Sequence, residues 1–137
     1  MASRRRIARI VVMQTLFEID FHEGETEGNP SEILERNVSD IKNEEIDKEF
    51  SQELLKGVVE YGEDVRSAMQ EHAPQWPLER MDRITRSILM LGTYELMYGN
   101  DAPAAVVMNE AIDIAKEFGG EESGKFVNGV LNAIAHN

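Results

Sequence analysis

The sequence predicts an all-α protein that folds as a single domain over residues 1–137. Three observations support this prediction. Apolar residues recur three and four positions apart along most of the chain, which is the period of an amphipathic helix. Helix-capping residues and prolines precede several of these runs, and a glycine pair follows one of them. No Asn-Gly or Asp-Gly pair links two runs of alternating apolar residues, as a β-hairpin would require.

Three helices are expected in the first half of the chain. The first runs from about residue 3 to residue 21 and ends at a polar loop. Asn29 and Pro30 open the second, because asparagine is a good N-cap and proline fits the first helical position. A long third helix is expected over about residues 45–72, because its apolar residues stand three or four positions apart. These residues are Phe50, Leu54, Val58, Tyr61 and Val65.

Three more helices are expected after two prolines break the chain. One runs over about residues 82–98, and Asp101 is expected to cap the next. The pair Gly119–Gly120 ends that helix, because glycine takes the left-handed conformation after a helix at little cost. We expect Lys125 and Phe126 to start the last helix, which carries its apolar residues on one face.

Charge is distributed unevenly along this acidic chain, whose formal net charge is -12. Residues 1–16 carry four arginines and no acid, whereas residues 17–64 carry 16 acids and 4 bases. A basic arm on an acidic body indicates two different partners, or one partner held away from the acidic surface. Cations at a helix N-terminus also oppose the helix dipole, at about 0.3–1 kcal/mol each. Stability alone therefore does not favour arginines at this place.

The arginines have two interpretations. One is a solubilising tail that meets the acidic surface of the same molecule; the other is phosphate binding, with Arg5, Arg6 and Arg9 directed at a nucleic-acid backbone. Arg5 and Arg9 stand four apart and share a helix face, and Phe17 falls near that stripe, where it could stack on a base or join the core. If these residues bind RNA, Arg5→Ala and Arg9→Ala should weaken binding and leave stability nearly unchanged.

Lys125 and Phe126 form a second candidate cluster, because a cation beside an aromatic ring suits a phosphate and a base together. If they start a helix, its first backbone N–H groups would also favour an anion. Phe126 fits the apolar face of the last helix equally well, so packing is the alternative interpretation.

Other chemistry is not indicated. Residues 119–125 match the letters of a phosphate-binding loop, but a helix precedes them and Phe126 replaces the hydroxyl residue that would bind magnesium. The chain has three scattered histidines and no cysteine, so we expect neither a metal site nor a cofactor. There is no nucleophile elbow, and we expect no enzyme. No apolar run reaches the about 18 residues of a membrane span, and we expect a cytoplasmic protein without a membrane partner.

Three segments together resemble the NusB family of bacterial transcription antitermination factors. They are RRRIARIVVMQTLFEID near the start, RITRSILMLGTYEL at 83–96 and, most specifically, VVMNEAIDIAKEFGGEESGKFVNGVL at 106–131. The resemblance implies about seven helices in two small perpendicular bundles, and no catalysis. It also implies binding of single-stranded boxA-type RNA together with the tenth protein of the small ribosomal subunit. Other Nus factors and RNA polymerase would be indirect partners.

The resemblance also implies which residues bind RNA. They are Arg5, Arg6 and Arg9 in the family's arginine-rich arm, Phe17 at an aromatic position near the RNA, and Glu122, Lys125 and Phe126 in a second RNA-facing segment. The sequence departs from the family at Met90, where an arginine usually stands four residues before the tyrosine. Arg83 and Arg86 are the candidates on the same helix to compensate for it.

Two other functions stay open at this point. One is a helical module that binds only proteins, and its acidic surface would suit a basic ribosomal protein. The other is an accessory domain of an rRNA methyltransferase, since NusB-like domains also occur fused to such enzymes; from a length of 137 residues we expect no methyltransferase domain. A homodimer is a possible oligomeric state.

Overall fold

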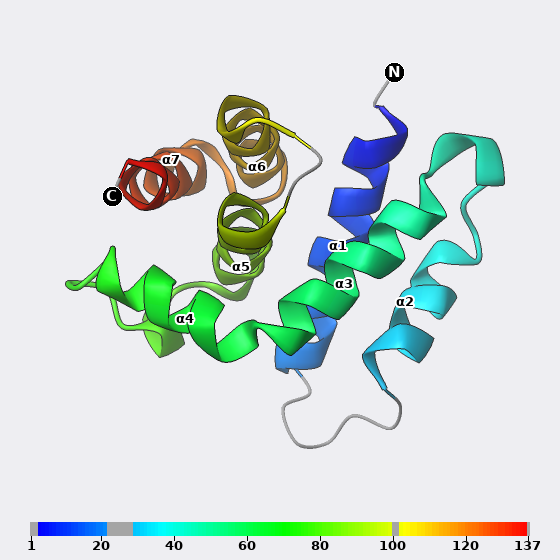
Figure 1. Cartoon of the computed structure of the whole chain (residues 1–137), viewed down its shortest axis with the longest axis horizontal. Coiled ribbons are helices and arrows are strands. Elements are labelled where there is room, and N and C mark those ends of the chain that lie inside the picture. The colour runs from blue at the N-terminus through cyan, green and yellow to red at the C-terminus, as the bar shows by residue number, and fades with distance from the viewer. Residues whose placement is uncertain (1–2, 22–28, 100–101, 137) are drawn as a thin grey trace.

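A computed structural model describes residues 3–21, 29–99 and 102–136 of the protein. Over these residues the fold is all-α, as predicted, with seven α-helices and two short 3-10 helices (Figure 1). The α-helices are α1 (Arg4–Phe21), α2 (Pro30–Val38), α3 (Lys48–Glu60), α4 (Gly62–Glu71), α5 (Arg83–Tyr98), α6 (Ala104–Gly119) and α7 (Glu121–Ala135). None of the helices in this described part is both long enough and apolar enough to cross a membrane.

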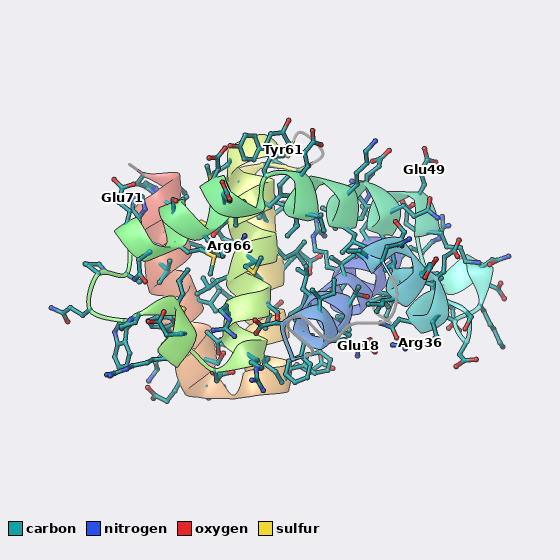
Figure 2. The ribbon with its side chains drawn as sticks, turned by 90° about the horizontal axis from the view of Figure 1, so that it is seen from below. Glu18, Arg36, Glu49, Tyr61, Arg66 and Glu71 are labelled. Carbon is teal, nitrogen blue, oxygen red and sulfur yellow. The ribbon has the colours of Figure 1, made fainter. Side chains whose placement is uncertain are left out.

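The helices form two bundles around two hydrophobic cores. The first bundle contains α1, α2 and α3, and the second contains α4, α5, α6 and α7 (Figure 1). In Figure 2, α5, α6 and α7 of the second bundle run up the page, while α3 of the first bundle lies across them. Glu18 of α1 and Arg36 of α2 form an ion pair at the edge of the first bundle (Figure 2).

The two cores share the helices at their boundary. Met13 lies on α1, a helix of the first bundle, yet its side chain is buried in the core of the second bundle. Leu91 of α5 is buried in the core of the first bundle in the same way. Met90 and Tyr94, also on α5, pack against both cores. Thus α1 and α5 join the two bundles through side chains that each contributes to the other's core.

Side-chain caps begin four of the helices. The side chains of Ser3, Asn29, Asp47 and Asp82 accept hydrogen bonds from the backbone N–H groups of Arg6, Glu32, Phe50 and Thr85, at 2.9–3.0 Å. Each bond satisfies an N–H group of the first turn that has no partner within its helix. The predicted starts of α2 and α5 are confirmed, whereas the predicted cap Asp101 lies outside the described residues.

The prediction of one continuous helix over residues 45–72 is wrong. The chain breaks at Tyr61, whose φ of -101° and ψ of 20° are not helical, and α4 continues from Gly62 in a new direction. The Tyr61 ring stacks on that of Tyr98 in α5, with centroids 4.2 Å apart. A glycine weakens a helix at this point, and the stacking fixes the bend. Apolar residues keep their spacing through the break, so periodicity alone does not reveal it.

Gly120 makes the turn between α6 and α7. Its φ of 89° and ψ of 176° lie in a region that is essentially restricted to glycine. The predicted end of α6 at the glycine pair is confirmed, but α7 begins at Glu121, immediately after this turn. The predicted start of the last helix at Lys125 and Phe126 is therefore wrong. Both residues lie in the second turn, where backbone N–H groups are already bonded within the helix.

Gly120→Ala should destabilise the protein by about 1–3 kcal/mol, because alanine rarely adopts this backbone conformation. Gly129→Ala is the matched control in α7, where an added Cβ would meet open space. We expect this change to stabilise the protein by up to about 1 kcal/mol, since alanine is the better helix former. Urea denaturation of the two variants measures both values. Equal unfolding midpoints for Gly120→Ala and the original protein would contradict the role of the turn.

Candidate nucleic-acid interface

The predicted RNA-binding residues lie toward opposite ends of α5. Arg9, one member of the arginine cluster (Arg5, Arg6, Arg9), contacts Glu95 near the C-terminal end of α5. Ser123, next to the α7 cluster (Glu122, Lys125, Phe126), contacts Thr85 in the first turn of α5. The ten residues from Thr85 to Glu95 correspond to about 15 Å along the helix axis. The described contacts therefore place these six residues in two clusters rather than one.

Arg9 is buried, with an exposed fraction of only 3%. Its Nε and Nη2 atoms donate hydrogen bonds to the two carboxylate oxygens of Glu95, at 2.8 and 2.9 Å. The guanidinium also lies 5.0 Å from the centre of the Phe50 ring. Burial opposes the charge of Arg9, but its hydrogen bonds and the negative charge of Glu95 outweigh that effect, so the pKa of Arg9 is raised. The geometry gives Arg9 a structural role between α1 and α5, while its contact with RNA stays a prediction.

Arg6 is held by two acidic residues of α6. Its Nε atom donates to Glu110, and its Nη2 atom donates to Asp113 at 2.9 Å. Partial burial opposes the charge of Arg6, but hydrogen bonds to Asp113 and Glu110 outweigh that effect and raise its pKa. A phosphate would have to compete with both carboxylates for this guanidinium.

Arg5 is the most exposed member of the arginine cluster, with 44% of its side chain accessible. Its Nε atom lies 3.8 Å from a carboxylate oxygen of Asp47, and its guanidinium lies 4.5 Å from the centre of the Phe50 ring. Arg5 and Arg9 thus approach the same ring, as their shared helix face predicts. Ion pairs and cation–π contacts of exposed side chains are weak, so these two contacts oppose a turn of Arg5 toward a phosphate only weakly.

Phe17 is half-buried near the C-terminal end of α1. One turn further on, Asp20 forms ion pairs with Arg83 and Arg86 of α5. Arg86 also donates to the carbonyl oxygen of Leu78 at 2.6 Å. Arg86 is therefore engaged within the protein.

The α7 cluster lies beside an exposed tryptophan that the sequence analysis did not select. Lys125 and Glu122 are exposed and form an ion pair at 3.6 Å. The half-buried Phe126 ring packs edge-on against Trp76, with centroids 5.8 Å apart. Trp76 comes from the segment between α4 and α5, and its exposed fraction is 56%. A tryptophan between two prolines is the signal that could have identified it, because such a segment is rigid and cannot bury the ring inside a helix.

Comparisons with known proteins identify the same family over almost the whole chain. A family model described as the NusB family matches residues 6–136. The transcription antitermination protein NusB of Fervidobacterium nodosum is 36% identical over 135 residues, which cover 98% of this chain and 92% of that relative.

Solved structures show the same fold. NusB of T. maritima matches with a TM-score of 0.85 and 34% identity, covering 100% of this chain and 94% of that one. A crystal structure of the antitermination factors NusB and NusE in complex with dsRNA contains a chain that matches with a TM-score of 0.83. Identity to that chain is 29%, and the match covers 96% of this chain and 95% of the other. The chain described here belongs to the NusB family.

Proposed function

We propose that this protein is a transcription antitermination adaptor that binds single-stranded boxA-type RNA together with the tenth protein of the small ribosomal subunit. It would act within a Nus-factor complex on RNA polymerase and catalyse no reaction. The observation that carries the proposal is similarity over nearly the full length to proteins named as transcription antitermination proteins. The solved complex of a related NusB with NusE, which is that ribosomal protein, and with dsRNA supports the ribosomal protein and an RNA as partners.

The two clusters suit an extended strand better than a compact ligand. Arg5 offers an exposed guanidinium at one end of α5, and Lys125 and Phe126 offer a cation and an aromatic ring at the other. Cations that follow a backbone and rings that stack on bases are the usual elements of single-strand binding. A spacing of about 15 Å along α5 requires a ligand that spans several nucleotides.

The acidic body favours a basic protein partner. The net charge of -12 includes the arginines, six of which are already paired with carboxylates of this chain. The remaining acidic surface attracts a basic protein and repels RNA that is not held by the two clusters. Because the acidic surface attracts a basic protein but repels RNA, we expect an adaptor with separate surfaces for RNA and protein.

Arg5→Ala should weaken RNA binding and reduce its dependence on salt. For single-stranded nucleic acid, log K falls with log salt at about -0.7 per neutralised phosphate. The slope should therefore become shallower by about 0.7 when Arg5 is removed. Fluorescence anisotropy of a labelled boxA-type RNA measures this at several salt concentrations, with and without the ribosomal partner. The matched control is Lys56→Ala, an exposed cation in the groove between α2 and α3.

The same titration distinguishes the RNA-binding adaptor from a helical module that binds only proteins. Salt-sensitive RNA binding that tightens when the ribosomal partner is added supports the adaptor. Association of the two proteins without RNA binding under either condition would instead identify a module that binds only proteins.

A further inference from the structure

Trp76 is held in a fixed position although its ring is mostly exposed. The side chain of Gln70, in α4, donates hydrogen bonds to the carbonyl oxygens of Ala73 and Trp76, both at 3.0 Å. The Oε1 atom of the same side chain accepts from the N–H group of Leu78 at 3.0 Å. One glutamine thus binds the segment before, at and after the tryptophan. Because this segment is already ordered, it has little conformational entropy left to lose when a ligand binds Trp76.

Space is present on two sides of the Trp76 ring. A groove of about 410 Å³ lies between Trp76, Phe126 and the first turn of α5, and Arg80 stands at its edge. A second groove of about 340 Å³ is lined by Trp76, Phe126 and Lys125. The two aromatic rings therefore separate two shallow grooves, and each groove has a cation beside it.

Two acidic residues of these grooves are already engaged within the protein. Both carboxylate oxygens of Asp82 accept hydrogen bonds from Thr85, one from its N–H group and one from its hydroxyl group. Glu122 is paired with Lys125. Arg80 is exposed. The combination of a fixed, exposed indole ring with two nearby cations favours a planar, negatively charged ligand over an apolar peptide.

We propose that Trp76, supported by Phe126, is a stacking site for one unpaired base of the bound RNA. Arg80 and Lys125 contact the phosphates on the two sides of that base. The inference rests on the proposed RNA binding and extends it, because it adds Trp76 and Arg80 to the residues expected from the family. It gives the α7 cluster a defined ligand, a nucleobase in single-stranded RNA.

The chain contains one tryptophan, so its intrinsic fluorescence reports on this site alone. A base stacked on the indole ring quenches its emission. We expect an unlabelled boxA-type RNA to quench the fluorescence of the full-length protein, with saturation at the concentration that saturates anisotropy. Trp76→Ala should weaken RNA binding about 5- to 100-fold, the usual range for removal of one stacking ring. Trp76→Phe keeps an aromatic face, so its RNA affinity should fall much less.

Val59→Ala is the matched control, because Val59 is an equally exposed apolar residue on α3, with an exposed fraction of 52%. It should leave RNA affinity unchanged. Circular dichroism melting shows whether Trp76→Ala remains folded, and the quenching of the original protein tests the site without any substitution.

The outcomes distinguish this inference from the proposed function. RNA binding by anisotropy with no quenching, and equal affinity for Trp76→Ala, would overturn the stacking site and leave the adaptor intact. Quenching by the ribosomal protein without RNA, at equal RNA affinity for the variant, would instead make the site a protein contact. Absence of RNA binding with and without the ribosomal partner would overturn both proposals.

Discussion

Replacing Arg9 with alanine should lower the free energy of unfolding by about 3–5 kcal/mol. The side chains of Arg9 and Glu95 are only 4% and 5% exposed, and two hydrogen bonds join them. Removal of the arginine would leave a buried carboxylate without its main partner, which costs far more than loss of a surface ion pair. Total stabilities are about 5–15 kcal/mol, so this one change would remove a large part of the total. The buried ion pair therefore predicts a large loss of stability at this position, whereas the sequence alone predicts almost none.

Arg5→Ala is the matched control, because Arg5 lies against the same Phe50 ring but is largely exposed. We expect it to change the free energy of unfolding by less than about 1 kcal/mol. Urea denaturation followed by circular dichroism measures both variants, and the two midpoints should differ clearly. The double variant Arg9→Met/Glu95→Leu removes both charges and should recover part of the loss. If Arg9→Ala unfolds at the same urea concentration as Arg5→Ala, the buried ion pair does not form in solution.

Gly57→Ala should destabilise the protein by about 1–3 kcal/mol through overpacking. In an exposed helix the same substitution usually stabilises by about 1 kcal/mol, so the expected sign is reversed. An added Cβ at Gly57 of α3 would overlap the hydroxyl oxygen and ring carbons of Tyr94 in α5. That ring has little room to move, because it packs against both cores and lies beside Tyr61 and Tyr98.

A second background tests the cause of this effect. The Tyr94→Ala variant lacks the ring that an added Cβ would overlap. In that variant, Gly57→Ala should not lower the free energy of unfolding further, and it should instead give the ordinary stabilisation by alanine in a helix. Thermal unfolding of the two single variants and the double variant gives the coupling between the positions. A gain in stability from Gly57→Ala alone would show that the tyrosine ring moves aside freely.

Local signals in the sequence account for the features that were predicted well. The capping residues Asn29 and Asp82 act within three residues of their own helix starts, and Gly120 acts at a single turn. Such features depend on neighbours along the chain, so the sequence alone reveals them. The break at Tyr61 depends also on stacking against Tyr98, which is 37 positions away, and the neighbouring Gly62 alone is too weak a signal to predict it.

The candidate site was predicted less completely for the same reason. Glu95, the partner of Arg9, is 86 positions away, and only the folded chain brings them together. One local signal was nevertheless present. At 100° per residue, Arg9 projects about 20° from Leu16 and about 40° from Met13, in the middle of the apolar face of α1. A charged residue at such a position indicates a buried partner. Arg5 also projects about 20° from Leu16, however, so this pattern does not separate Arg5 from Arg9.

The exchange of Met13 and Leu91 between the two cores has a consequence for how the chain unfolds. Neither bundle can lose its structure without opening the core of the other, because each core contains a side chain from its neighbour. The protein should therefore melt in one cooperative transition, and hydrogen exchange in α1 and α5 should occur only through global unfolding. Two halves made as separate polypeptides would each expose the apolar surface that the other normally covers. The bundles are distinct in architecture but form a single thermodynamic unit.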